Sequence, residues 1–158
     1  MLESKPIVSR FLSIAFCLII TISSSLMFSH PALAATGLNN GQLSPCPESP
    51  NCVVSQNGDD THSVAAIPYT SDRATAKETL IKVLSVVPRT EVVEQTDNYI
   101  HAESTSRIFK FVDDAEFYFP EDEKVIEVRS ASRVGESDLG VNRRRIEQIR
   151  LAMEDIGA

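Results

Sequence analysis

The sequence lacks the short motifs that mark common cofactor sites: it has no phosphate-binding glycine loop, no dinucleotide fingerprint and no haem attachment site. Histidine and cysteine are scarce, with three residues of each in 158, so little material exists for a metal centre. Internal repeats are also absent. We therefore expect a protein without a cofactor.

Positive charge is in deficit. The formal net charge is −7, and without Glu3, Lys5 and Arg10 the remaining chain holds 13 basic and 21 acidic residues, a net charge of −8. This balance argues against a nucleic-acid partner and against an anionic membrane bound by general electrostatics. It does not exclude a local basic pocket.

The N-terminal segment has the composition of an export signal. Lys5 and Arg10 precede an apolar run, and Ala32 and Ala34 supply the small residues that a signal peptidase needs at −3 and −1. Cleavage after Ala34 would make residues 1–34 a signal peptide and export the rest of the chain. The alternative is an uncleaved anchor helix, because the run approaches the length of a membrane span. The membrane is then contacted through this segment only.

Only two cysteines lie beyond the signal, Cys46 and Cys52, because Cys17 falls in the apolar run. A close pair in an exported protein is most simply a disulfide. Zinc is the alternative, with His62 as a third ligand, but the spacing is wider than usual for zinc and no fourth ligand is evident.

The first regular element is expected late in the chain. Residues 35–44 have the composition of a flexible N-terminal linker, and no helix or strand is predicted before Pro68. Asp72 is then a good N-cap for an amphipathic helix that runs to about Val86.

Two hairpins should follow. Residues 90–96 and 99–106 flank a turn signal and predict the first, after which residues 107–112 should continue in an extended conformation. The second has its turn at residues 120–123, and its alternating apolar side chains fix the parity of the pairing. The expected register pairs Phe119 with Lys124, Phe117 with Ile126, Ala115 with Val128, Asp114 with Arg129, and Asp113 with Ser130.

A C-terminal amphipathic helix is predicted from about Val141, with an apolar stripe through Ile146, Ile149, Met153 and Ile156. Two helices packed on an antiparallel sheet of about four or five strands make an α+β fold. Residues 45–158 should therefore form one small α+β domain.

Arginines gather in one stretch of this acidic chain. Arg143, Arg144 and Arg145 begin the C-terminal helix, where cations oppose the helix dipole unless a negative partner is present. Helix N–H groups and guanidinium forks together suit a phosphate, sulfate or carboxylate. We therefore expect a non-enzymatic domain that binds an anionic small molecule or an acidic protein segment. The predicted ligand-binding residues are Arg129, Ser130, Ser132, Arg133, Asn142, Arg143 and Arg145.

Three carboxylates, Asp113, Asp114 and Asp138, should hold these arginines in place. The alternative is that the same carboxylates simply neutralise the arginines, which would make the stretch an internal brace. The two interpretations differ for Arg133→Ala, which should weaken ligand binding far more than folding if the stretch is a binding site.

Two further functions stay open. An assembly or scaffold factor for envelope or photosynthetic membrane complexes would show an exposed apolar patch. A hydrolase with Asp113 or His62 as its base would place His62 within reach of Asp113 or Ser137.

Four stretches carry a resemblance to a known family. They are Cys46-Pro-Glu-Ser-Pro-Asn-Cys-Val53, Tyr99-Ile-His-Ala-Glu103, Phe111-Val-Asp-Asp-Ala-Glu-Phe117, and the arginine-rich segment from Arg129 to Arg145. Together they resemble the DUF1499 family, a domain of unknown function. An exported form with an Ala-Leu-Ala-Ala junction is similar to cyanobacterial members, which implies the periplasm or the thylakoid lumen. The resemblance implies no chemistry, substrate or cofactor.

Overall fold

The computed structural model describes residues 36–157. The predicted signal peptide and its cleavage site lie outside this range. In chain order the elements are β1 (Leu38–Asn39), β2 (Gln42–Leu43), β3 (Cys52–Val54), β4 (Ile67–Pro68), α2 (Arg73–Val86), β5 (Thr90–Gln95), β6 (Tyr99–Thr105), β7 (Val112–Tyr118), β8 (Val125–Ser132) and α3 (Val141–Ile156). No helix within residues 36–157 is long and apolar enough to cross a membrane.

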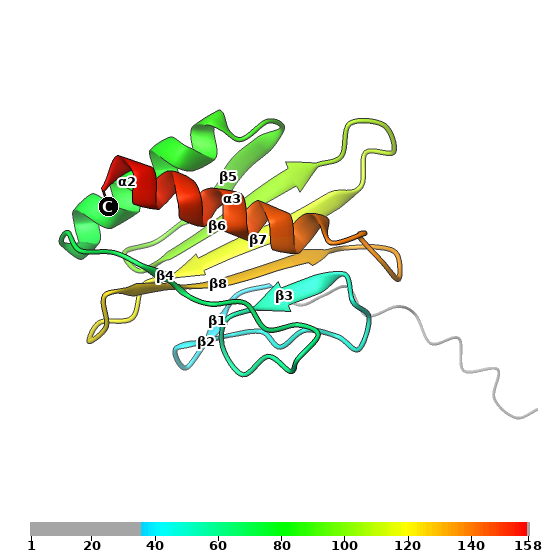
Figure 1. Ribbon diagram of the computed structural model, residues 1–158, viewed down its shortest axis with the longest axis horizontal. Helices are drawn as coiled ribbons and strands as arrows, with labels where there is room; N and C mark the ends of the chain where they lie inside the picture. The colour runs from blue at the N-terminus through cyan, green and yellow to red at the C-terminus, as the bar shows by residue number, and fades with distance from the viewer. Residues whose placement is uncertain (1–35, 158) are drawn as a thin grey trace, which may run out of the picture. The chain divides into compact units, whose positions relative to one another are not determined.

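A six-stranded antiparallel sheet forms the centre of the fold (Figure 1). Its strand order is β3-β8-β7-β6-β5, and β4 pairs with the start of β8 while β3 pairs with its end. The predicted α+β class with two helices is confirmed. The sheet is larger than expected because the short strands β3 and β4 add to the edge of β8.

Both helices pack on one face of this sheet and close the main core. Helix α2 begins where the Asp72 side chain accepts a hydrogen bond from the backbone of Thr75, and it ends at Val86, two residues before Pro88. Helix α3 buries Ile146, Ile149 and Met153 of its predicted stripe, but Ile156, in the last turn, is exposed. Each helix therefore forms where the sequence pattern predicts it.

The N-terminal part of the domain is more regular than predicted. The expectation of no helix or strand before Pro68 is wrong, because β1 and β2 form a hairpin and β3 joins the sheet. Asn40 and Gly41 make the hairpin turn with φ values of 51° and 77°. An Asn-Gly pair is the usual sequence signal for such a turn. The hairpin packs Leu43 against Tyr99, on the sheet face opposite the helices.

The cysteines form the predicted disulfide, Cys46–Cys52, with 5.6 Å between their Cα atoms. The zinc alternative fails because both sulfurs are used in this bond. The His62 ring instead contacts Asp59 Oδ1 at 2.8 Å and the Ser49 carbonyl oxygen at 3.2 Å.

The register of the second hairpin differs from the prediction by two residues. Phe117 lies opposite Val128, not Ile126, so the parity and the buried face are as expected. The turn is longer than predicted because its ends are used elsewhere: the Phe119 amide donates to Asn98, and the Lys124 carbonyl accepts from Tyr69.

This shift changes which polar residues meet. The corrected pairs are Glu116 with Arg129, Asp114 with Ala131, Ala115 with Ser130, and Asp113 with Ser132. The predicted partners Asp114–Arg129 and Asp113–Ser130 are therefore wrong. Glu116, which the predicted register left beside another glutamate, receives the arginine instead.

The segment after β6 also differs from the prediction. Residues 107–112 are not extended: they form the loop that joins β6 to β7, and only Val112 belongs to a strand. Ser106 and Phe111 close the loop with a backbone hydrogen bond, and Lys110 adopts a left-handed φ of 57°.

Candidate functional site

The arginine-rich stretch is divided between the two faces of the sheet, because β8 alternates its side chains. Arg129 and Arg133 lie on the face opposite the helices, whereas Ser130 and Ser132 face α3. The predicted ligand-binding residues other than Arg143 therefore form two separate polar clusters, one on each face.

The first cluster is centred on a fully buried ion pair. Arg129 Nη1 lies 2.7 Å from Glu116 Oε2, and both side chains have no solvent exposure. Glu116 Oε1 also accepts hydrogen bonds from the Tyr99 hydroxyl at 2.7 Å and the Gly37 amide at 2.6 Å. Burial, followed by the charge of Glu116, raises the pKa of Tyr99, so this phenol stays a hydrogen-bond donor. Arg129 thus has a structural role, because its buried side chain is not accessible to a ligand.

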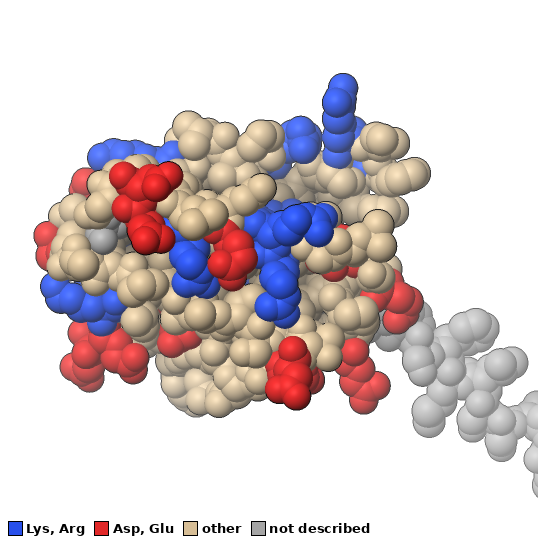
Figure 2. Space-filling view, in the orientation of Figure 1, with Lys and Arg blue, Asp and Glu red and all other residues tan. Residues whose placement is uncertain are grey.

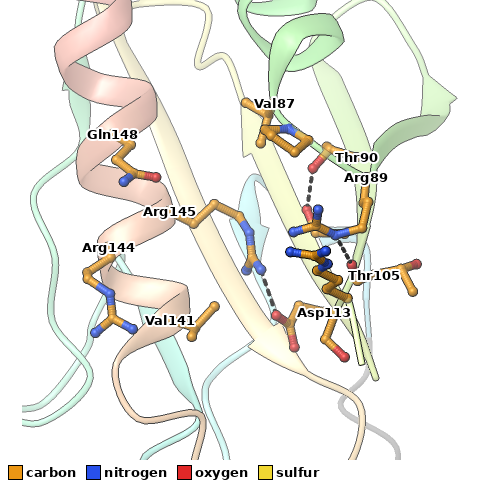
Figure 3. Close-up of a pocket in the computed structure, with 13 residues that line it drawn as sticks. Val87, Arg89, Thr90, Thr105, Asp113, Val141, Arg144, Arg145 and Gln148 are labelled. Carbon is orange, nitrogen blue, oxygen red and sulfur yellow. Dashed lines mark hydrogen bonds and ion pairs between the residues drawn. The ribbon is translucent and has the colours of Figure 1, made fainter. Parts of the chain in front are cut away.

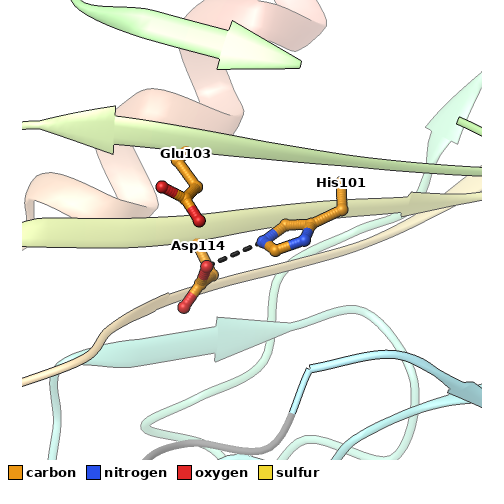
Figure 4. Close-up of side chains that lie close together, drawn as sticks. All are labelled: His101, Glu103 and Asp114. Carbon is orange, nitrogen blue, oxygen red and sulfur yellow. Dashed lines mark hydrogen bonds and ion pairs between the residues drawn. The ribbon is translucent and has the colours of Figure 1, made fainter. Parts of the chain in front are cut away.

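Arg133 belongs to the same face, where it bridges two carboxylates. Its Nε and Nη2 atoms bind Asp114 at 3.0 and 2.8 Å, and Nη2 also binds Glu103. His101 Nε2 lies 2.7 Å from Asp114 Oδ1, the oxygen that Arg133 Nη2 also contacts (Figure 4). The hydrogen bond to Asp114 is the main reason that the pKa of His101 is raised. Burial acts to raise the pKa of Asp114, but the bonds from His101 and Arg133 outweigh burial and lower it.

His101, Glu103 and Asp114 are residue types that bind metal ions, and their ligand atoms lie within 4.8 Å of one another. The guanidinium of Arg133 already supplies the positive charge between the two carboxylates. A divalent cation would have to displace Arg133, so the charges favour an internal salt-bridge network over a metal centre.

The second cluster joins the start of α3 to the helix-covered face of the sheet. Asn142, fully buried, accepts a hydrogen bond from Ser130 at 2.6 Å and donates to Ser132 at 3.1 Å. Arg145 donates to Asn142 Oδ1 and to Asp113 Oδ2, each at 2.6 Å. Ser132 satisfies the other oxygen of Asp113 at 2.6 Å. The cluster fixes Arg145 at the wall of a pocket.

Two further predicted residues act at the helix end. Asp138 caps α3, since its two carboxylate oxygens accept from the amides of Gly140 and Asn142. Arg143 points to the neighbouring loop and donates to the carbonyl oxygens of Ser63 and Thr61 at 2.7 and 2.8 Å. Neither side chain lines the pocket beside Arg145.

That pocket has a volume of about 420 Å³ and lies between α3 and the β5–β6 edge (Figure 3). Arg145 reaches from α3 to Asp113, while Arg89 lies on the opposite wall and donates through Nε to the Thr105 carbonyl at 3.0 Å. Arg107 and Arg144 complete a set of four arginines, and Asp113 is the single acidic residue in the lining. The pocket is thus strongly positive in an acidic protein.

The charge in the pocket is largely uncompensated. Of its four arginines, Arg145 alone has a carboxylate partner among residues 36–157. Arg89 and Arg144 donate to backbone carbonyls, which carry no net charge. Hydroxyl groups lie beside them, and Thr90 and Ser104 are hydrogen-bonded to each other at 2.7 Å. Cations and hydroxyls are the groups that bind phosphate, sulfate and carboxylate ligands.

Residues 42–153 match the family model described as "Protein of unknown function (DUF1499)". The chain belongs to the DUF1499 family. No curated protein matches the sequence. The matched residues include every residue that lines the pocket, so the pocket lies within the DUF1499 domain of this chain.

Three arginines of this pocket, Arg89, Arg107 and Arg144, were not among the predicted site residues. Arg144 lies in the arginine run at the start of α3, and a sequence signal also existed for the other two. Arg89 directly precedes β5, and Ser106 separates Arg107 from the end of β6. Both arginines therefore lie at the open end of the first predicted hairpin. Pairing of Thr90 with Ser104 brings the two arginines to the same edge. The hairpin prediction alone could therefore have joined them, but only the tertiary structure places α3 opposite.

Proposed function

We infer that this DUF1499 domain binds a small anionic molecule in the pocket between α3 and the β5–β6 edge. One observation carries the inference: Arg89, Arg107 and Arg144 line one pocket and have no carboxylate partners among the described residues. The volume of about 420 Å³ suits a small molecule, because ligand pockets span roughly 300–1,000 Å³. The ligand class is a phosphate, sulfate or carboxylate compound.

Three like charges in one pocket repel each other, and a bound anion relieves this repulsion. Guanidinium groups also present planar, paired donors that match two oxygens of a phosphate or carboxylate. Arg145 differs from the others because Asp113 already holds it. Arg145 therefore helps to position the pocket wall, while the three uncompensated arginines attract the anion.

The geometry gives less support to the hydrolase. The His62 ring is engaged by Asp59 and Ser49, whereas Asp113 is engaged by Ser132 and Arg145. The Cys46–Cys52 disulfide supports the proposal that the domain works in an oxidising compartment, the periplasm or the thylakoid lumen.

Thermal unfolding and calorimetric titration with phosphate, sulfate and citrate test the proposal. A ligand present at 100 times its dissociation constant stabilises the fold by about 2.7 kcal/mol, which shifts the midpoint measurably. We expect Arg89→Gln and Arg144→Gln each to weaken anion binding by about tenfold, since each removes a charge-assisted hydrogen bond. Arg73→Gln, at the start of α2 and outside the pocket, is the matched control and should leave the affinity unchanged.

Arg133→Ala provides the contrast. The sequence favoured a loss of ligand binding, but Arg133 lies on the opposite face with Asp114 and Glu103. We now expect lower stability with unchanged anion affinity. Failure of all three anions to shift the midpoint, or equal losses in Arg73→Gln and Arg89→Gln, would overturn the pocket as a binding site.

A further inference from the structure

The loop between β6 and β7 exposes a cluster of apolar side chains. Ile108 is 77 % exposed, Phe109 is 72 % exposed and Phe111 is 51 % exposed. The two phenylalanine rings stack on each other, with 5.5 Å between their centroids. None of the three belongs to the hydrophobic core clusters of the described domain.

The fold does not require apolar residues at these positions. The loop is closed by the Ser106–Phe111 backbone hydrogen bond and by the Ser106 hydroxyl, which accepts from the Phe111 amide at 2.9 Å. Polar side chains would satisfy the same backbone geometry. Adjacent exposed apolar residues on an ordered loop indicate a surface that is covered by a partner.

The charges around the loop identify the partner's chemistry. Arg107 and Lys110 alternate with the apolar residues, and residues 106–111 include no acidic side chain. At the corner of the molecule where this loop lies, the space-filling view shows basic and uncharged residues without acidic ones (Figure 2). The arginine pocket begins at the same place, because Arg107 lines it. The partner must therefore present negative charge and apolar groups a short distance apart.

An anionic lipid surface has this combination. Aromatic rings enter the boundary between headgroups and acyl chains, while arginine and lysine reach back to the phosphates. A protein partner fits less well, since three side chains provide far less than the roughly 1,000 Å² that a stable interface buries. The net charge of −7 does not prevent contact, because salt screens distant charges beyond about 10 Å.

We propose that the β6–β7 loop docks the protein on an anionic membrane surface, with Phe109 and Phe111 inserted at the interface and Lys110 on the lipid phosphates. These three residues do not line the arginine pocket, so docking and small-anion binding can fail independently.

The absence of tryptophan from the sequence allows a direct test. Phe109→Trp in the full chain places a single indole in the loop, and Leu151→Trp places one on an exposed position of α3 as the matched control. With vesicles of phosphatidylcholine and phosphatidylglycerol, we expect a blue shift and quenching by brominated acyl chains for Phe109→Trp only. Vesicles of phosphatidylcholine alone should give a much weaker response. The apolar N-terminal segment is common to both variants, so the difference between them reports the loop.

Charge and apolar contributions can be separated in the Phe109→Trp background. Lys110→Gln should weaken partition into the anionic vesicles by about fivefold, while Lys82→Gln on α2 should not. Phe111→Ser should weaken it by about tenfold, because one ring then stays in water. Phosphate affinity should persist in every loop variant.

Three results would overturn the proposal. The first is an indole at position 109 that neither shifts nor is quenched. The second is equal quenching at positions 109 and 151, which would assign the contact to another segment. The third is a blue shift without vesicles that grows with protein concentration, which would show that a second copy of the chain covers the loop.

Discussion

At the scale of single residues, the Arg129–Glu116 pair has the largest energetic consequence. Both charges are withdrawn from water, and among residues 36–157 no acceptor is found for Arg129 Nε or Nη2. Desolvation of a buried pair can exceed the attraction between the charges. The pair is therefore a specific link between β7 and β8. Removal of one partner is strongly unfavourable, because the other charge stays buried without compensation.

We expect Glu116→Ala to lower the free energy of unfolding by about 3–5 kcal/mol, because it leaves Arg129 buried without a counter-charge. The double variant Glu116→Leu with Arg129→Met should recover most of this loss, since it replaces the pair by apolar groups of similar size. Urea unfolding of the three proteins measures the effect. Equal destabilisation of the single and double variants would show that packing, and not the buried charge, is the cause.

The His101–Asp114 contact predicts a dependence of stability on pH. The pKa of His101 is raised in the folded protein above its ordinary 6.5, mainly by the hydrogen bond to Asp114. The stabilisation is therefore complete below pH 6.5 and is lost as the pH rises through the folded-state value. The charged groups facing the imidazole are Asp114, Glu103, Glu116 and the guanidinium of Arg133.

Urea unfolding at a series of pH values checks this expectation. The wild-type protein should lose stability as the pH is raised above 6.5, and His101→Gln should show a much smaller loss over the same range. His62→Gln is the control, because its ring contacts a different carboxylate, Asp59. If the pH dependence of stability persists in His101→Gln, another titratable group causes it.

At the scale of elements, the start of α3 combines capping with attachment to the sheet. Gly140 is the N-cap residue and has no side chain, so Asp138 supplies the missing acceptors. Leu139, between them, has a left-handed φ of 53°. Three successive arginines follow in a helix end that already disfavours cations. The carboxylate of Asp138 offsets this unfavourable arrangement.

Asp138→Ala should therefore destabilise the protein by about 1 kcal/mol, as the loss of a helix cap does. Asp138→Asn should cost less, because the amide oxygen still accepts one backbone hydrogen bond. Thermal unfolding of the two variants measures the difference. If Asp138→Ala is neutral, the adjoining Asn142 network alone holds the helix end.

At the scale of the whole molecule, paired and unpaired charges lie in different places. Three acids on the face opposite the helices, Glu103, Asp114 and Glu116, are paired with Arg133, His101 and Arg129. Three arginines without a carboxylate partner among residues 36–157, Arg89, Arg107 and Arg144, line the pocket next to the exposed β6–β7 loop. An acidic protein can thus present one basic, partly apolar corner. The binding and docking proposals both depend on this separation.

Local sequence patterns predicted the two helices, the strands β5 to β8, the class of fold and the disulfide. Helical periodicity located α2 and α3, the Asp72 cap marked the start of α2, and the parity of alternation identified the core face of β7 and β8. These features are local, because each depends on residues a few positions apart. The short N-terminal strands were missed because they form mainly by pairing, although Asn40-Gly41 carried a turn signal.

The polar contacts, in contrast, depend on how the elements pack together. A two-residue change in register leaves the apolar pattern intact but moves Arg129 from Asp114 to Glu116. The division of the arginines between two faces follows from strand alternation combined with the position of α3. The pocket joins Arg89 and Arg107 to Arg144 and Arg145, which come from elements distant in the chain. The hydrophobic pattern determines which face of a strand or helix is buried, but it does not determine which polar side chains contact each other. Such a site therefore forms only when the sheet edge and the helix are packed together.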